Sequence, residues 1–235
     1  MNKTQLVTTL FSATLLLTAC GSDSTSNSGP ADSSSSTNET RTSNSGPADS
    51  SSSTNETRLS DIEVEGLLFM REEEELARDL YLDLYDAKGL EIFQNISNNA
   101  ESKHADKMKQ LMDEYGIDDP STGERDTYTD QHLQELYDEL LNQGLGSDDL
   151  AALRVGAFVE ETDIRDINTH LDHVSAEHTD IISSYKNLLC GSRNHLRAFA
   201  QQIEDNTGSA YVTQVPELDA EVRAILTSDK ERCGK

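Results

Sequence analysis

Four long stretches of the sequence carry apolar residues at the spacing of an α-helix, and this period constrains the fold more than any other feature. In the first, "LSDIEVEGLLFMREEEELARDLYLDLYDAKG", Ser60 or Asp61 is a candidate N-cap and Gly89 a candidate C-cap. The other three are expected at about 90–115, from Ser147 onward, and at about 176–204. No segment shows the sustained alternation of a half-buried strand, so the sequence predicts an all-α fold.

The connections between these stretches predict the topology. Only a few residues join the first stretch to the second and the third to the fourth, which indicates two antiparallel hairpins. About thirty residues, with a short helix "TDQHLQELYDELLNQG", separate the second from the third. One long crossover between two hairpins is typical of a ferritin-like four-helix bundle, expected here over residues 59–205. Residues 206–235 are expected to form a C-terminal tail with a short helix in "PELDAEVRAILTSD".

The first 19 residues have the layout of a lipoprotein signal peptide. They hold one lysine and an apolar core from Leu6 to Leu17, followed by small residues before Cys20. "LTAC" resembles a bacterial lipobox, which predicts that Cys20 is lipidated. We therefore expect an exported lipoprotein, anchored to a membrane through that lipid and facing the periplasm or the cell surface. The alternative is an ordinary signal peptide with an incidental cysteine.

Residues 20–58 are expected to be a disordered linker rich in Ser and Thr. The segment "TSNSGPADSSSSTNETR" runs from Thr25 to Arg41 and is repeated without change from Thr42 to Arg58. It offers no apolar residue larger than alanine for a core, so it should act as a flexible tether. A cell-wall-spanning segment or a glycosylated stalk would have the same composition.

Charge and cysteine content narrow the function further. The formal net charge of -25 argues against nucleic acid as a partner, because phosphates are bound by Lys and Arg, and favours cations instead. Besides Cys20 the chain has Cys190 and Cys233. An exported protein meets oxidising conditions, so these two either form a disulfide or remain two free thiols.

Several ionisable residues fall on the apolar side of the expected helices. In "REEEE" the apolar stripe selects Glu74 as the inward residue. The second stretch places a carboxylate and an imidazole one turn apart at Glu101 and His104, and the fourth places His195 among apolar residues. On the third, Glu160 lies in the stripe with Asp163 one turn further on. A rotation of that helix would exchange Glu160 for Glu161.

This set resembles a dinuclear carboxylate metal site. Such sites take one Glu from each of two helices and a Glu-x-x-His from each of the other two. Here Glu101 and His104 supply one such motif, but the second reads Ser192-x-x-His195. Asp163 is therefore the candidate for the fourth carboxylate. The predicted ligands are Glu74, Glu101, His104, Glu160, Asp163 and His195. Iron is the expected metal, and the same donors also suit manganese or zinc.

Separated motifs carry a resemblance to known families. "EELARDLY" resembles the first-helix ligand motif of rubrerythrins, with the carboxylate at Glu74. Together with "AESKH", "VGAFVEETDI" and "LLCGSRNHLRAF", it makes residues 59–204 look like the ferritin-like family called domain of unknown function 2202. The resemblance implies a ferritin-like fold and a rubrerythrin-type or ferritin-type site.

Three functions follow from these observations. The first is a di-iron enzyme that reacts with O2 or peroxide, with His104 and His195 as terminal ligands and Glu101 as the bridging carboxylate. Tyr81 or Tyr185 would then be a nearby hydrogen-bond donor or electron source. Because the sequence has no Cys-x-x-Cys centre, an electron donor would be external, and a homodimer is a candidate assembly.

The other two functions need no catalysis. One is a metal-binding surface lipoprotein that stores or passes on a metal. The other is a metal-free bundle in which the inward residues bond to one another and Arg78 and Arg193 neutralise the carboxylates.

Overall fold

The computed structural model describes residues 58–234, and every regular element within that range is a helix. The predicted signal peptide, Cys20 and almost all of the predicted linker lie outside the described residues. The helices are α1 (Asp61–Lys88), α2 (Glu91–Ile96), η1 (Ser97–Glu101), α3 (Ser102–Tyr115), α4 (Gln131–Gly144), α5 (Asp149–Leu171), α6 (Thr179–Thr207), η2 (Pro216–Leu218) and α7 (Asp219–Thr227). None of the described helices is long and apolar enough to cross a membrane.

The ends of α1 lie where the sequence predicts them. The backbone N–H of Ser60 donates to Oε2 of Glu63 at 2.8 Å, which closes a capping box at the first turn. At the other end Gly89 has a φ of 68°, and its N–H donates to the carbonyl of Tyr85. That left-handed conformation costs glycine little, so the chain reverses there and α2 begins.

The second predicted helix is interrupted by a π-helical turn. The sequence predicts one regular helix over about 90–115, whereas the structure inserts η1 between α2 and α3. Ser97 and Ser102 stabilise this turn: the Ser97 hydroxyl donates to the Arg78 carbonyl at 2.9 Å, and the Ser102 hydroxyl donates to the Ser97 carbonyl at 2.9 Å. Such turns are frequent at functional sites. Here the turn ends on Glu101.

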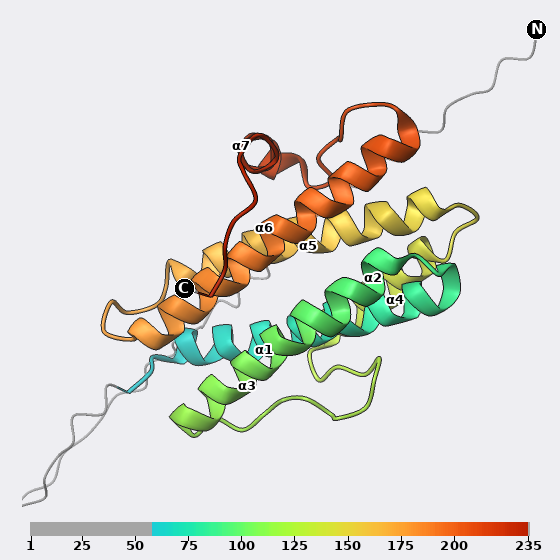
Figure 1. Cartoon of the computed structure of the whole chain (residues 1–235). Coiled ribbons are helices and arrows are strands. Elements are labelled where there is room, and N and C mark those ends of the chain that lie inside the picture. Colours follow the sequence, from blue (N-terminus) through green and yellow to red (C-terminus); the bar gives the residue numbers. More distant parts are fainter. Residues whose placement is uncertain (1–57, 235) are drawn as a thin grey trace, which may run out of the picture. The chain divides into compact units, whose positions relative to one another are not determined.

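The long helices pack in two pairs that also contact each other (Figure 1). α1 lies along α3, α5 lies along α6, and α1–α5 and α3–α6 contacts join the two pairs. α4 packs against α1 and α5. A close approach of α5 and α6 depends on Gly156, because a Cβ there would lie 2.4 Å from the ring of Phe199.

The crossover from α3 to α4 covers a charged part of α1. Arg71, Glu72, Glu73, Glu74 and Glu75 are all buried, so the prediction that only one residue of "REEEE" faces inward is wrong. The guanidinium of Arg71 donates to Asp119 at 3.1 Å, and Glu72 accepts the backbone N–H of Asp130 at 2.9 Å. The helical wheel could not show the burial of Arg71 and Glu72, because a loop distant in sequence contacts them.

The helix expected from Ser147 onward is α5, and its N-cap lies one residue later. The carboxylate of Asp148 accepts the backbone N–H of Ala151 at 2.8 Å, so Asp148 fills this role. The short helix predicted in the tail is present as η2 and α7, and α7 packs against α6.

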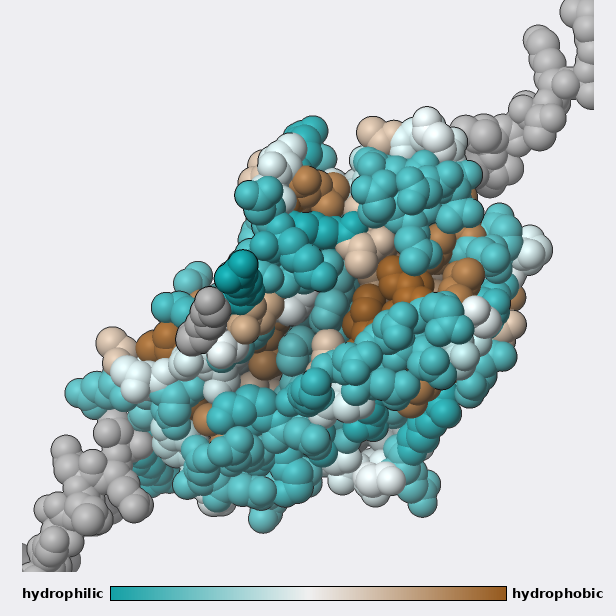
Figure 2. Space-filling view, viewed as in Figure 1, coloured by the Kyte–Doolittle hydropathy of each residue, from teal (hydrophilic) through white to brown (hydrophobic). Residues whose placement is uncertain are grey.

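A disulfide fastens the end of the chain to α6. Cys190 and Cys233 are paired, with their Cα atoms 5.6 Å apart. Arg193 and Arg197 both donate to the carboxylate of Glu231, which holds the segment just before Cys233 against the same helix. The face in Figure 2 is mostly hydrophilic, and the largest hydrophobic area visible on it lies in a hollow between α6 and α2.

Candidate metal centre

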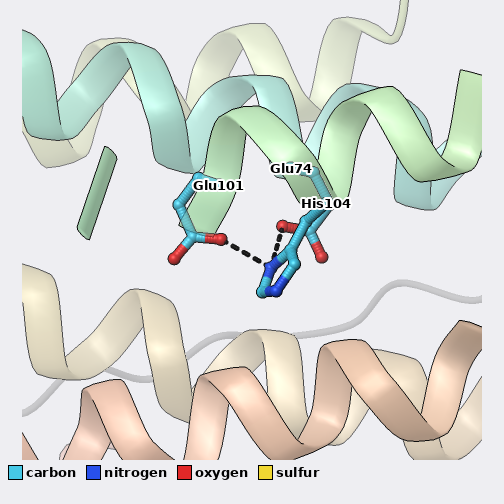
Figure 3. A group of neighbouring side chains, drawn as sticks. All are labelled: Glu74, Glu101 and His104. Atoms are coloured by element: carbon cyan, nitrogen blue, oxygen red, sulfur yellow. Dashed lines mark hydrogen bonds and ion pairs between the residues drawn. The ribbon is translucent and has the colours of Figure 1, made fainter. Parts of the chain in front are cut away.

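Three inward residues from α1, η1 and α3 meet in a first group. Nδ1 of His104 lies 2.8 Å from Oε2 of Glu101 and 3.2 Å from Oε2 of Glu74 (Figure 3). Glu101 and Glu74 are 2% and 1% exposed. The spacing of three residues between Glu101 and His104 brings both to one side of the chain, and α1 supplies Glu74 from across the helix pair.

A second group shares Glu101 with the first. Nδ1 of His195 on α6 lies 2.9 Å from the other oxygen of Glu101, Oε1, and 3.4 Å from Oε2 of Glu160 on α5. Within each group, one ligand atom per residue lies within 4.8 Å of the others, close enough to hold a metal ion. The two imidazole rings are roughly parallel, with centroids 6.0 Å apart. Glu101 therefore stands between two similar sets of donors.

Four donor atoms of the predicted ligands are buried without a hydrogen bond. They are Oε1 of Glu74, Oε1 of Glu101, Oδ1 of Asp163 and Nδ1 of His195. Nδ1 of His195 and Oε1 of Glu101 lie 2.9 Å apart, yet the bond direction is unsuitable for a hydrogen bond. Buried polar atoms are rarely left without a partner, and a cation would serve all four. The donor set thus fits one or two divalent metal ions.

Burial and mutual repulsion shape the ionisation of the carboxylates. Burial raises the pKa of Glu74 to about 8 against the opposing effect of His104. The pKa of Asp163 lies well above its usual value because of burial, and then because of the charges of Glu74 and Glu160. Burial also raises the pKa of Glu160. Without a cation, protons must offset part of the negative charge.

The pKa values of the two imidazoles are raised as well, and for an imidazole this favours the charged form. Burial alone would lower the pKa of His195, but the carboxylates of Glu160 and Glu101 outweigh it and raise that pKa to about 10. Burial would raise the pKa of Glu101, but His195 and His104 lower it below its usual value. Binding a metal ion here would require the imidazoles to lose these protons, so metal affinity should depend on pH.

Asp163 makes its hydrogen bond to the residue that breaks the dinuclear pattern. The Ser192 hydroxyl on α6 donates to Oδ2 of Asp163 on α5, and both residues are buried. Asp163 is in neither three-residue group. The pair thus occupies the side of the site where the second Glu-x-x-His motif would supply its carboxylate.

The two candidate tyrosines lie in different places. The Tyr81 hydroxyl donates to Oε1 of Glu160 at 2.6 Å, so it contacts one of the groups directly. Tyr185 is not brought to them: its hydroxyl lies near Gly66 and its pKa responds to burial and to the charge of Glu63. Of the two residues left open on α5, Glu160 is the one beside His195. Glu161 instead accepts the Tyr211 hydroxyl and two backbone N–H groups of the tail.

No Lys or Arg of the described range forms an ion pair with these carboxylates. Arg78 pairs with Glu75 and Asp79, and Arg193 pairs with Glu231. The two arginines considered as internal counter-charges therefore lie elsewhere.

Gly191 supports the site and was missed by the sequence reasoning. A Cβ at this position would lie 2.6 Å from Cε1 of His104. α6 must therefore lack a side chain here for the His104 ring to keep its place. An isolated glycine inside a helical pattern was the available signal, since it indicates a close approach of another group.

The comparisons with known proteins find relatives of this chain. "Uncharacterized protein MJ0754" of Methanocaldococcus jannaschii is 41% identical over 175 residues, covering 74% of this chain and 91% of the relative. The crystal structure of hypothetical protein MJ0754 from Methanococcus jannaschii DSM 2661 matches with a TM-score of 0.69 and 39% identity, covering 77% of this chain and 100% of that one. The family model described as "Uncharacterized protein domain (DUF2202)" matches residues 63–229, from the first turn of α1 to just beyond α7. The chain therefore belongs to the DUF2202 family.

Proposed function

We propose that this chain is a ferritin-like four-helix bundle whose function depends on a dinuclear carboxylate–histidine metal centre. The observation that carries the proposal is the position of Glu101, whose two oxygens lie 2.8 Å from Nδ1 of His104 and 2.9 Å from Nδ1 of His195. A carboxylate shared by two sets of donors is the arrangement by which such bundles hold two ions.

Each residue then has a defined role. Glu101 would donate to both ions, His104 and Glu74 would hold one of them, and His195 and Glu160 would hold the other. The Tyr81 hydroxyl fixes the orientation of Glu160 through its 2.6 Å hydrogen bond. Asp163 supplies the fourth carboxylate on the side where α6 carries Ser192.

Iron is the proposed metal, and manganese or zinc would suit the same oxygen and nitrogen donors. When bound, a pair of iron ions supplies reactivity toward O2 or peroxide, as in ferroxidase or peroxidase chemistry. The residues hold and orient the ions and exclude bulk water, since the carboxylates are buried. Electrons would come from an external donor.

A metal-binding role without catalysis is the second candidate. The bond between Ser192 and Asp163 favours it, because it engages one Asp163 oxygen and leaves one fewer carboxylate than the usual dinuclear set. Such a protein would keep or pass on a metal. For either role we propose export and anchoring to a membrane through a lipid on Cys20, and a homodimer as the assembly to test.

The metal content of the chain tests the proposal. Residues 21–235 would be loaded anaerobically with Fe2+ and freed of excess metal, and the bound iron would be counted. We expect close to two ions per chain, lost in Glu101→Ala/His104→Ala. The matched control is Asp113→Ala/His132→Ala, which removes the same two kinds of side chain from exposed positions. One ion per chain would favour the binding role, and none would overturn both.

A further inference from the structure

A pocket of about 420 Å³ lies on the outer side of the two imidazoles, between the end of α2, the start of α3 and α6. His104 and His195 line it, and each of their side chains is 14% exposed. Nδ1 of each ring faces the buried carboxylates. The pocket is therefore a second compartment, separated from the candidate metal centre by the two rings.

The outer nitrogen of each ring has no protein partner in the described range. The hydrogen bonds and ion pairs of His104 and His195 all involve Nδ1, and none involves Nε2. With a metal ion on Nδ1 the ring proton is on Nε2, so this step rests on the proposed function. Metal-ligating histidines almost always donate that second N–H to an acceptor. Here no carboxylate or carbonyl of the described range takes that role, so the pocket is the place from which an acceptor can reach Nε2.

The charge of the pocket is opposite to that of the protein. The chain has 44 Asp and Glu residues against 19 Lys and Arg, yet the pocket lining includes Lys103 and Lys230 and no carboxylate. In the segment 228–234 that carries Lys230, Asp229 does not line the pocket, and Glu231 is paired with Arg193 and Arg197. Two ammonium groups and two imidazole N–H donors around one pocket attract an anion and would repel a metal cation.

Three residues give the pocket apolar walls, beside the polar side chains of Asn95, Asn99 and Asn194. Ile96, Ala100 and Ala198 line it from α2, η1 and α6. Its volume is in the range of small-molecule sites, and a simple oxyanion would leave those walls in contact with water. We infer that this pocket binds a small organic anion, whose charged group accepts the Nε2–H bonds of His104 and His195 and whose apolar part packs on these walls. The ligand would then be linked to both metal ions through their own imidazole ligands.

Calorimetric titration tests this inference on residues 21–235 loaded with Zn2+, after the metal content has been counted. The probes are benzoate, the neutral benzyl alcohol and inorganic phosphate, all at one ionic strength. We expect benzoate to bind at least about tenfold more tightly than either of the others. Lys103→Gln/Lys230→Gln should weaken benzoate binding about tenfold, because it removes two charged contacts.

The matched control is Lys107→Gln/Lys109→Gln, which removes the same charge from α3 outside the pocket and should leave benzoate binding unchanged. Equal binding of benzyl alcohol, or equal loss of benzoate binding in both double variants, would overturn the anion site. If phosphate binds as tightly as benzoate, the apolar part of the ligand contributes nothing, and the inference of an organic ligand is overturned. If the chain takes up metal normally but does not bind benzoate, this inference is refuted and the proposed function is not. A chain that takes up no metal would refute the proposed function first.

Discussion

The Ser192 hydroxyl donates a hydrogen bond to Oδ2 of Asp163, and this contact joins α5 to α6 beside the candidate metal centre. In the dinuclear pattern position 192 would carry a glutamate, three residues before His195. At that position this chain has a serine on α6, whose hydroxyl holds the shorter carboxylate of Asp163 on α5. Three of the following predictions concern the consequences for metal binding.

Restoring the glutamate should strengthen binding of the second ion. Ser192→Glu adds a carboxylate beside Asp163, so the metal-free variant should melt at a lower temperature than wild type because like charges repel in a buried place. The metal-loaded variant should melt at a higher temperature, since binding to the native state adds stability. Ser192→Gln is the control of similar size, and metal should raise its melting temperature no more than it raises that of wild type. Loss of metal from Ser192→Glu would contradict this prediction.

Glu101 should matter to both ions and its neighbours to one each. Glu101→Gln removes the charge shared by the two groups, so bound metal should fall from about two ions per chain toward none. Glu74→Gln and Glu160→Gln should each leave about one. Metal counted after gel filtration distinguishes these results. An equal loss in all three variants would instead indicate a single ion held by the whole cluster.

Gly191→Ala should weaken metal binding while the fold persists. Its Cβ would lie 2.6 Å from Cε1 and 2.8 Å from Nε2 of His104, so the ring must move away from Glu74 and Glu101. We expect metal affinity to fall at least about tenfold, equivalent to about 1.4 kcal/mol. Gly144→Ala is the control, because its Cβ would lie 2.5 Å from Leu84 and meets no metal ligand. That variant should lose stability and keep its metal affinity.

Helical periodicity predicted the elements well because each long helix has its own apolar stripe. The ends of α1 at Ser60 and Gly89 follow from local rules of capping. The stripes also predicted which ionisable residues lie on the inward side of each helix. The structure places these residues together in two groups, formed by Glu74, Glu101, His104, Glu160 and His195.

Features that depend on distant segments could not be predicted in this way. Glu72 is buried because the crossover ending at Asp130 folds over it, and no helical wheel contains that loop. The choice between Glu160 and Glu161 as the ligand depends on the tail, which no helical wheel includes. The backbone N–H groups of Gln214 and Val215 donate to the carboxylate of Glu161. The π-turn at η1 likewise depends on the contact of Ser97 with the carbonyl of Arg78 on α1.

The disulfide should contribute substantially to stability. It closes a loop with a sequence separation of 43 residues, and cross-linking a loop of that length stabilises a protein by about 4 kcal/mol in the chain-entropy model. Cys190→Ser/Cys233→Ser should therefore unfold at lower urea concentration than the oxidised wild type. Adding a reductant should bring the wild type to the variant's midpoint and leave the variant unchanged. A midpoint shared by all samples would mean that Glu231 and its arginines fasten the tail alone.

Glu63 should make stability depend on acid pH at the start of α1. Burial would raise the pKa of Glu63, but hydrogen bonds from Ser60, the Ser175 backbone N–H and the His178 ring lower it from 4.5 to about 2. The folded state thus holds this carboxylate ionised more firmly than the unfolded state does. Its contribution is fully present above about pH 4.5 and is lost as the pH falls toward about 2.

Urea unfolding of metal-free wild type and Glu63→Gln between pH 7 and pH 3 tests this sign. The difference in unfolding free energy should be constant near neutrality and should shrink below about pH 4.5, because protonated wild type loses what the variant already lacks. Glu65→Gln, an exposed neighbour on the same helix, should show a small difference at every pH. Titration of the carboxylates around Glu101 is common to wild type and variant, so it cancels in each comparison. A Glu63 difference that stays constant to pH 3 would mean that the three donors stabilise the neutral acid as well as the carboxylate.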